Sequence, residues 1–187
     1  QGEAVTVSAA CASGTLAVLQ GALRLAAGES SAVLILGLDI LSRFVLSGFA
    51  SLQGLSTEGC RPFDRDRDGL SLGEGTAFLL LTADDQSRPQ TPRLARLTGW
   101  GTACDANHIT APCRQASGLI AALRQTTAAK RPVGAVNAHG TGTLYNDAME
   151  LLAFGTLWPE EGPPVHSVKG AIGHCLGAAG GIEGALA

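Results

Sequence analysis

The sequence has few charged and few aromatic residues, and no hydrophobic run long enough to cross a membrane. Charged residues make up 16% of the 187 residues and hydrophobic residues 45%, which excludes a disordered chain and is typical of a densely packed α/β protein. The longest apolar run, residues 32–38, is only as long as a strand. Aromatic residues are at 4%, no basic run is present and the net charge is −3, so the composition gives no support for nucleic-acid binding.

Several common site motifs are also missing. The five cysteines are irregularly spaced, without a CxxC or a His/Cys pair at zinc-site spacing, so no metal site is predicted. The odd number of cysteines favours a reduced setting, and we expect a cytoplasmic protein. Neither GxGxxG nor GxxxxGK[ST] occurs, so we interpret the glycine-rich residues 173–181 as close helix–sheet packing. Because the chain starts without Met and stops inside a predicted helix, we expect an internal segment of a longer protein.

Strands and helices alternate along the chain, which indicates a parallel sheet with helices on both faces. Strands are predicted at residues 5–10, 32–38, 76–82, 93–102, 133–138 and 164–168. Helices are predicted at residues 11–27, 116–129, 147–157 and 176–187, with a short helix and loop at 41–54. The proline-containing polar residues 87–92 mark the best internal boundary and divide the chain into residues 1–86 and 87–187.

Three reactive side chains follow predicted strands. Cys11, His139 and Lys169 come after the strands that end at residues 10, 138 and 168. Active residues of parallel sheets gather at the carboxyl ends of the strands, so we expect the three to share a site. A thiol at the start of a helix is favoured as the nucleophilic thiolate. On its own, a cysteine among alanines is usually a small core residue.

Two further segments carry candidate ligand-binding groups. After His139, glycines let a ligand approach the backbone, and Thr141 and Thr143 can hydrogen-bond a polar arm. Lys169 and His174 lie five residues apart and can converge on one cavity. The alternatives are a histidine that caps a turn, an exposed lysine and a histidine at a helix start.

Four motifs in order resemble those of β-ketoacyl-[acyl-carrier-protein] synthases of the elongating type, which belong to the thiolase superfamily. They are Ala-Cys-Ala-Ser-Gly at residues 10–14, Arg-Pro-Phe-Asp to Gly-Glu-Gly at 61–75, Asn-Ala-His-Gly-Thr-Gly-Thr at 137–143 with Asn-Asp after it, and Lys-Gly-Ala-Ile-Gly-His-Cys-Leu-Gly-Ala-Ala-Gly at 169–180. The resemblance implies a thiolase-like layered αβαβα fold, present here as a partial segment. Residues 1–86 would end an N-terminal half that carries the nucleophile, and residues 87–187 would form most of a C-terminal half.

The resemblance also implies an acyltransferase, a 3-oxoacyl-[acyl-carrier-protein] synthase that extends a fatty-acid or polyketide chain by decarboxylating Claisen condensation. Cys11 would accept the acyl group. His139 and His174 would donate N–H groups to the enolate formed from malonyl-carrier protein, and Lys169 would hold positive charge beside them.

Supporting roles follow from the same resemblance. Glu150 and Glu183 would orient Lys169 or a bound water, although carboxylates on helices, including Asp147, are normally solvated. Thr110, Thr141 and Thr143 would contact the phosphopantetheine arm of the carrier protein. For Thr110, an ordinary surface loop is an equally good interpretation.

The resemblance implies no metal or organic cofactor, because the phosphopantetheine belongs to the acyl carrier protein. Expected partners are that carrier protein and a second subunit, in a homodimer or a ketosynthase-type heterodimer at full length. Two alternatives remain. One is a non-catalytic partner subunit like the chain-length factors, which replace the nucleophilic cysteine. The other is a thiolase, which is expected to have a second cysteine where this chain has His139.

Overall fold

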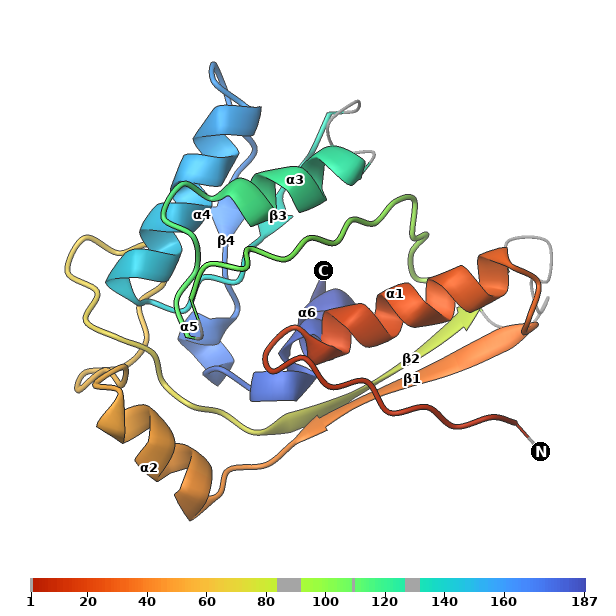
Figure 1. Ribbon diagram of the computed structural model, residues 1–187, viewed down its shortest axis with the longest axis horizontal. Coiled ribbons are helices and arrows are strands. Elements are labelled where there is room, and N and C mark those ends of the chain that lie inside the picture. Colours follow the sequence, from red (N-terminus) through yellow and green to blue (C-terminus); the bar gives the residue numbers. More distant parts are fainter. Residues whose placement is uncertain (1, 84–91, 109, 127–131) are drawn as a thin grey trace. The chain divides into compact units, whose positions relative to one another are not determined.

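The computed structural model describes residues 2–83, 92–108, 110–126 and 132–187 (Figure 1). The chain forms two compact units. Unit 1 comprises Gln1–Leu46, Leu72–Leu94 and His174–Ala187, and unit 2 comprises Ser47–Ser71 and Ala95–Gly173. Each unit is therefore assembled from segments that are distant in the sequence.

Unit 1 is built on an antiparallel pair of strands, β1 (Ala32–Asp39) and β2 (Gly75–Thr82). Ala32 lies opposite Thr82, and Asp39 opposite Gly75. Both predicted strands are confirmed. The parallel arrangement is wrong for this pair, because the chain enters β2 at the same end of the pair at which it leaves β1.

One face of this pair is covered by α1 (Ser13–Ala26), the 3-10 helix η2 (Leu176–Ala178) and α6 (Ala179–Leu186) (Figure 1). The helices approach closely because glycines line them. A Cβ on Gly14 of α1 would lie 2.7 Å from the backbone nitrogen of Gly181, and Gly37 of β1 lies against Ala178. The interpretation of residues 173–181 as a packing stretch is confirmed.

The other face of the pair is apolar and open to solvent in this chain. Side chains alternate along both strands, as the two-residue period of a strand requires. Ile35 and Ala77 point to the helices and are 5% and 8% exposed, whereas Leu36 and Phe78 on the opposite face are 54% and 64% exposed.

Unit 2 contains a short parallel pair, β3 (Val136–Asn137) and β4 (Val165–His166), with Val136 opposite Val165. The helices around it are α3 (Ser117–Gln125), α4 (Leu144–Leu157) and α5 (Lys169–Ile172), and α3 packs on α4. The predicted strands at 133–138 and 164–168 are thus confirmed as two-residue strands in the predicted parallel sense. A further helix, α2 (Arg43–Ser51), confirms the helix expected within residues 41–54.

Two predicted strands are wrong. Residues 5–10 and 93–102 form no strand in the structure. Apolar alternation favours a strand only where a neighbouring strand supplies hydrogen bonds, and β1–β2 and β3–β4 are the strand pairings among the described residues. Of the predicted boundary at 87–92, only residue 92 is described, and the predicted end of a helix at 127–129 also lies outside the described residues. None of the helices in the described part of the chain is long and apolar enough to cross a membrane.

Candidate active site

The turn that presents Cys11 directly precedes α1 in unit 1. Ala10 has a left-handed backbone, with φ 48°. The Ala12 N–H donates to the Ala9 carbonyl at 3.1 Å, and the Ser13 N–H donates to the Ala10 carbonyl at 3.1 Å. These bonds close a tight turn around Cys11, which is half-buried. The prediction of a thiol at a helix start is confirmed, but a loop rather than a strand leads into it.

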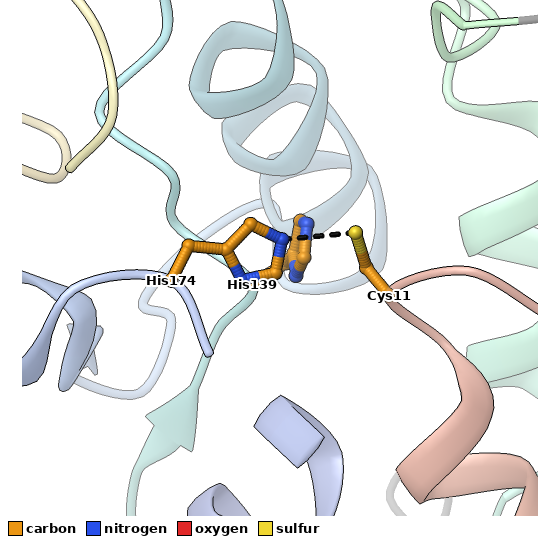
Figure 2. Close-up of side chains that lie close together, drawn as sticks. All are labelled: Cys11, His139 and His174. Atoms are coloured by element: carbon orange, nitrogen blue, oxygen red, sulfur yellow. Dashed lines mark hydrogen bonds between the residues drawn. The ribbon is translucent and has the colours of Figure 1, made fainter. Parts of the chain in front are cut away.

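Cys11 contacts the imidazole of His174 within the same unit. The Cys11 Sγ lies 2.9 Å from His174 Nε2, as the dashed line in Figure 2 shows. Either the thiol donates to a neutral ring nitrogen or Nε2–H donates to a thiolate, depending on the tautomer. The pair can therefore pass a proton between sulfur and nitrogen, the arrangement of an activated cysteine nucleophile.

His174 is itself fixed by the chain around it. It is 1% exposed, and its carbonyl accepts the Gly73 N–H at 3.0 Å. Just after it, the Gly177 N–H donates to Asp39 Oδ2 at 2.9 Å, which ties η2 to the end of β1. His174 and the segment after it are thus attached to the residues just before β2 and to the end of β1.

In unit 2, His139 and Lys169 lie together beyond the ends of β3 and β4. Lys169 is 1% exposed, and its Nζ lies 3.3 Å from His139 Nδ1. An ammonium group only donates, so a protonated Lys169 requires Nδ1 to accept and leaves the proton of the neutral ring on Nε2. This tautomer gives His139 an N–H donor on the side away from Lys169.

The carboxylate of Glu150 holds the main chain of the His139 turn. Glu150 is 3% exposed on α4 and accepts the N–H groups of His139 at 2.7 Å and Gly140 at 2.6 Å. The side-chain amide of Asn146 donates to it at 2.8 Å. Burial raises the pKa of Glu150, and the two backbone N–H donors act in the opposite direction.

Asp147 is a functional candidate that the sequence reasoning did not select. It is 0% exposed, so the expectation that carboxylates on these helices are solvated is wrong for Asp147 and for Glu150. Its carboxylate accepts the N–H groups of Phe63 at 2.8 Å and Gly142 at 3.2 Å and pairs with Arg67 Nε at 3.5 Å. Asp147 therefore joins the segment around residues 61–67 to the loop after His139. Its signal in the sequence was its place in the Asn-Asp pair, four residues after the Gly-Thr-Gly-Thr run.

Thr141 and Thr143 lie together in this loop. Their hydroxyl oxygens are 2.9 Å apart, and the thiol of Cys60 donates to the Thr141 carbonyl at 3.1 Å. Burial raises the pKa of the Cys60 thiol, which favours the protonated form that donates. A Cβ on Gly142 would lie 2.7 Å from the Gly69 carbonyl oxygen, so the two loops touch at their backbones.

The remaining candidates have different surroundings. Thr110 is exposed in a loop of unit 2, where its N–H donates to His108 Nδ1 at 3.1 Å. Glu183 lies half-buried on α6 of unit 1, whereas Lys169 belongs to unit 2. Within the units, the structure brings together Cys11 with His174, and His139 with Lys169.

Family models match both parts of the chain. Residues 1–87 match the model described as beta-ketoacyl synthase, N-terminal domain, and residues 94–187 match beta-ketoacyl synthase, C-terminal domain. The 3-oxoacyl-[acyl-carrier-protein] synthase 2 of Vibrio harveyi is 33% identical over 198 residues, which cover 98% of this chain and 48% of that protein. The mitochondrial 3-oxoacyl-[acyl-carrier-protein] synthase of Arabidopsis thaliana is 34% identical and covers 93% of this chain and 41% of its own length.

Solved ketosynthase structures are also similar to this chain. A ketosynthase in complex with its chain length factor from Xenorhabdus doucetiae matches with a TM-score of 0.86 and 37% identity, over 97% of this chain and 44% of the solved one. The ishigamide ketosynthase/chain length factor matches with a TM-score of 0.90 and 32% identity, over 98% of this chain and 46% of the solved one. The predicted thiolase-like α/β fold is confirmed, and the chain spans about half the length of the curated relatives it matches. With its residues matched from 1 to 87 and from 94 to 187, the chain belongs to the beta-ketoacyl synthase family.

Proposed function

We propose that the full-length protein is a 3-oxoacyl-[acyl-carrier-protein] synthase, which condenses an acyl-enzyme thioester with malonyl-carrier protein and releases CO₂. The observation that carries the proposal is the 2.9 Å contact between Cys11 Sγ and His174 Nε2 in a chain of this family. A thiol paired with a buried imidazole is suited to form a thioester and then to release it.

The first step is acyl transfer to Cys11. The thiolate attacks the thioester carbonyl of the acyl-phosphopantetheine, a new C–S bond forms and an oxyanion develops. The Cys11 backbone N–H is one donor to that oxyanion. The C–S bond to phosphopantetheine then breaks, and the departing sulfur takes the proton that the Cys11 thiol gave up.

The second step is condensation. Malonyl-carrier protein loses its carboxylate as CO₂, and the electrons of the broken C–C bond form an enolate on the thioester. N–H groups of His139 and His174 stabilise the enolate oxygen, each by a few kcal/mol, roughly as one oxyanion donor does. The enolate carbon attacks the acyl-Cys11 carbonyl, a C–C bond forms, and the Cys11 thiolate leaves.

The buried charges of unit 2 support this role of His139. Lys169, 3.3 Å from His139 Nδ1, favours the tautomer whose Nε2–H is the donor, and Glu150 fixes the backbone of the His139 turn. We assign Thr141, Thr143 and Thr110 to the phosphopantetheine arm. Glu183 is assigned to the orientation of Lys169 or a bound water.

The proposed partners are an acyl carrier protein and a second ketosynthase-type subunit, in a homodimer or a heterodimer. The arm comes with the carrier protein, so the reaction takes no metal or organic cofactor. We also propose that residues 1–86 and 87–187 belong to the N- and C-terminal halves of the thiolase-like fold. The matches to residues 1–87 and 94–187 support this division.

A second candidate function is that of a non-catalytic chain-length-factor subunit. It is favoured by the similarity to solved structures that contain a ketosynthase together with a chain length factor. The resemblance implies that such subunits replace the nucleophilic cysteine, whereas this chain has Cys11 next to His174. The reactivity of Cys11 therefore separates the two functions.

The proposal is tested by incubating the full-length protein with a carrier protein that bears an acyl group on its phosphopantetheine, and by locating the transferred acyl group with mass spectrometry. Wild type is expected to carry the acyl group on Cys11, and Cys11→Ala is expected to carry none. Cys104→Ala, which removes an exposed thiol in unit 2, is the matched control and should acylate like wild type. Acylation that persists in Cys11→Ala would contradict the proposal. His139→Ala should still acylate but release ¹⁴CO₂ from labelled malonyl-carrier protein more slowly.

A further inference from the structure

We propose that Ser13 is a positioning residue that orients the Cys11 backbone N–H toward the oxyanion of the acyl-transfer step. The inference rests on the proposed function, because it concerns the donor that acyl transfer to Cys11 uses.

The Ser13 hydroxyl bridges the two residues that precede Cys11. Its Oγ accepts the Ala9 N–H at 2.8 Å and donates to the Ala10 carbonyl at 2.6 Å. The Ala10 carbonyl also accepts the Ser13 backbone N–H at 3.1 Å. One side chain thus links the Ser8–Ala9 peptide group, through its N–H, to the Ala10–Cys11 peptide group, through its carbonyl.

This bridge fixes the direction of the Cys11 N–H. The carbonyl of Ala10 and the N–H of Cys11 belong to one planar peptide unit, and the described chain has no cis peptide bond. In a trans peptide unit the C=O and the N–H point in opposite directions. A hydroxyl that holds the Ala10 carbonyl on one side therefore holds the Cys11 N–H on the other side.

The conformation of Ala10 is one that its surroundings must hold, and the Ser13 hydroxyl adds to the backbone bonds that do so. The Ala10 φ of 48° lies in the left-handed region, which costs free energy for a residue with a Cβ. A residue persists in this conformation only where its surroundings impose it. Without the two Ser13 hydroxyl bonds, the Ser13 backbone N–H still donates to the Ala10 carbonyl, but the Ala10–Cys11 peptide group is held less firmly.

The thiol is held by a different contact. Cys11 Sγ lies against His174 Nε2, and His174 is fixed by the segment that packs on β1 and β2. Loss of the Ser13 hydroxyl should therefore disturb the oxyanion donor more than the nucleophile. This difference can be measured, because alkylation of a thiolate needs no oxyanion donor whereas acyl transfer does.

The test compares two reactions of Cys11 in the full-length protein, namely acyl transfer from an acyl-N-acetylcysteamine thioester and alkylation by iodoacetamide. Ser13→Ala is expected to slow acyl transfer by about tenfold or more, since loss of a whole oxyanion donor costs about 100- to 1,000-fold. Alkylation should change much less. Ser13→Thr, which keeps the hydroxyl, should restore most of the acyl transfer. Ser42→Ala, which removes a hydroxyl that caps α2 at the Val45 N–H, is the matched control and should leave both rates as in wild type.

The proposal is overturned if Ser13→Ala transfers the acyl group at the wild-type rate. It is also overturned if both reactions of this variant slow equally, or if Ser13→Thr is as slow as Ser13→Ala. A wild-type protein that is never acylated on Cys11 overturns the proposed function itself, and the Ser13 assignment falls with it. A wild-type protein that acylates while Ser13→Ala matches it overturns only the Ser13 assignment.

Discussion

The Cys11 turn of unit 1 and the His139 turn of unit 2 are held by different kinds of interaction. The hydrogen bonds that close the Cys11 turn join neutral groups three or four residues apart, chiefly through the hydroxyl of Ser13. The His139 turn is held by the buried carboxylates of Glu150 and Asp147, and Asp147 also reaches Phe63, which is 84 residues away in the sequence. The first turn is a local structure, and the second exists only when distant parts of the chain have folded together.

The two turns should therefore fail in different ways. Loss of a neutral, local bond in unit 1 changes the direction of one peptide group. Loss of the buried Asp147 carboxylate in unit 2 leaves backbone N–H groups without their acceptor and the Arg67 guanidinium without its charged partner, and such groups are costly to leave buried. Loss of a buried carboxylate in unit 2 should lower stability, whereas loss of the Ser13 hydroxyl in the Cys11 turn should lower the rate of acyl transfer.

The largest effect is expected for Asp147→Ala. This change removes the acceptor of the Phe63 and Gly142 N–H groups and the partner of Arg67. It should lower the free energy of unfolding by about 3–5 kcal/mol, as the breaking of a buried ion pair does. Urea unfolding of the full-length protein measures it. A loss below about 1 kcal/mol, the range of exposed pairs, would show that the carboxylate of Asp147 does not hold unit 2 together.

The next effect concerns the helix that carries the Cys11 turn. A Cβ at Gly14 would lie 2.7 Å from the Gly181 nitrogen and 3.0 Å from the Gly177 oxygen. Because backbone rather than a flexible side chain must move, Gly14→Ala should cost about 1–3 kcal/mol. Gly48→Ala in α2, where nothing lies within 4 Å, is the matched control. It should be neutral or stabilise by up to about 1 kcal/mol. Equal unfolding midpoints for the two variants would contradict the close approach of α1 and α6.

The difference between local and long-range contacts also explains how far the sequence could predict this structure. The leucine spacing of α1 and the apolar runs of β1 and β2 are local patterns, and these elements lie where they were predicted. Residues 5–10 are similarly apolar but form no strand, because the pairing of strands depends on partners elsewhere in the chain. For the same reason the antiparallel pairing of β1 with β2 could not be read from the order of the elements.

The candidate site shows the same division. The short motifs identified Cys11, His139, Lys169 and His174 as candidates, because a reactive side chain among small residues can be recognised from its neighbours in the sequence alone. Asp147 was not selected, because its burial depends on a segment some eighty residues earlier that covers it. The bond from the Cys60 thiol to the Thr141 carbonyl, which also joins distant residues, was equally invisible to the sequence.

A pH titration sharpens the contrast between the turns. The pKa of Glu150 is raised above the ordinary 4.5, mainly by burial, so the folded state binds this proton more tightly than the unfolded state. The corresponding part of the stability is present below pH 4.5 and is lost as the pH rises through the folded pKa. Glu150→Gln should remove this slope from unfolding curves measured at successive pH values. Ser13→Ala, which removes only a neutral group, should leave the slope in place, and a slope that is unchanged in Glu150→Gln would assign it to another residue.

The smallest effect is expected for the exposed counterpart of the Asp147–Arg67 pair, which is Glu3 with Arg24 in unit 1. The atoms of this pair are closer, at 2.7 Å against 3.5 Å, but the side chains are 64% and 32% exposed, whereas those of Asp147 and Arg67 are 0% and 14% exposed. Hydrogen bonding to Arg24, and then its charge, lower the pKa of Glu3. The small stabilisation from Glu3 is therefore present above its unfolded pKa and is lost as the pH falls through the folded pKa.

In an NMR titration, Arg24→Ala should move the Glu3 pKa back up without a measurable change in the unfolding midpoint. Added salt should also raise the Glu3 pKa of the wild-type protein, because salt screens the attraction between the two exposed charges. A midpoint shift as large as that of Asp147→Ala would mean that distance rather than burial decides the strength of these two pairs.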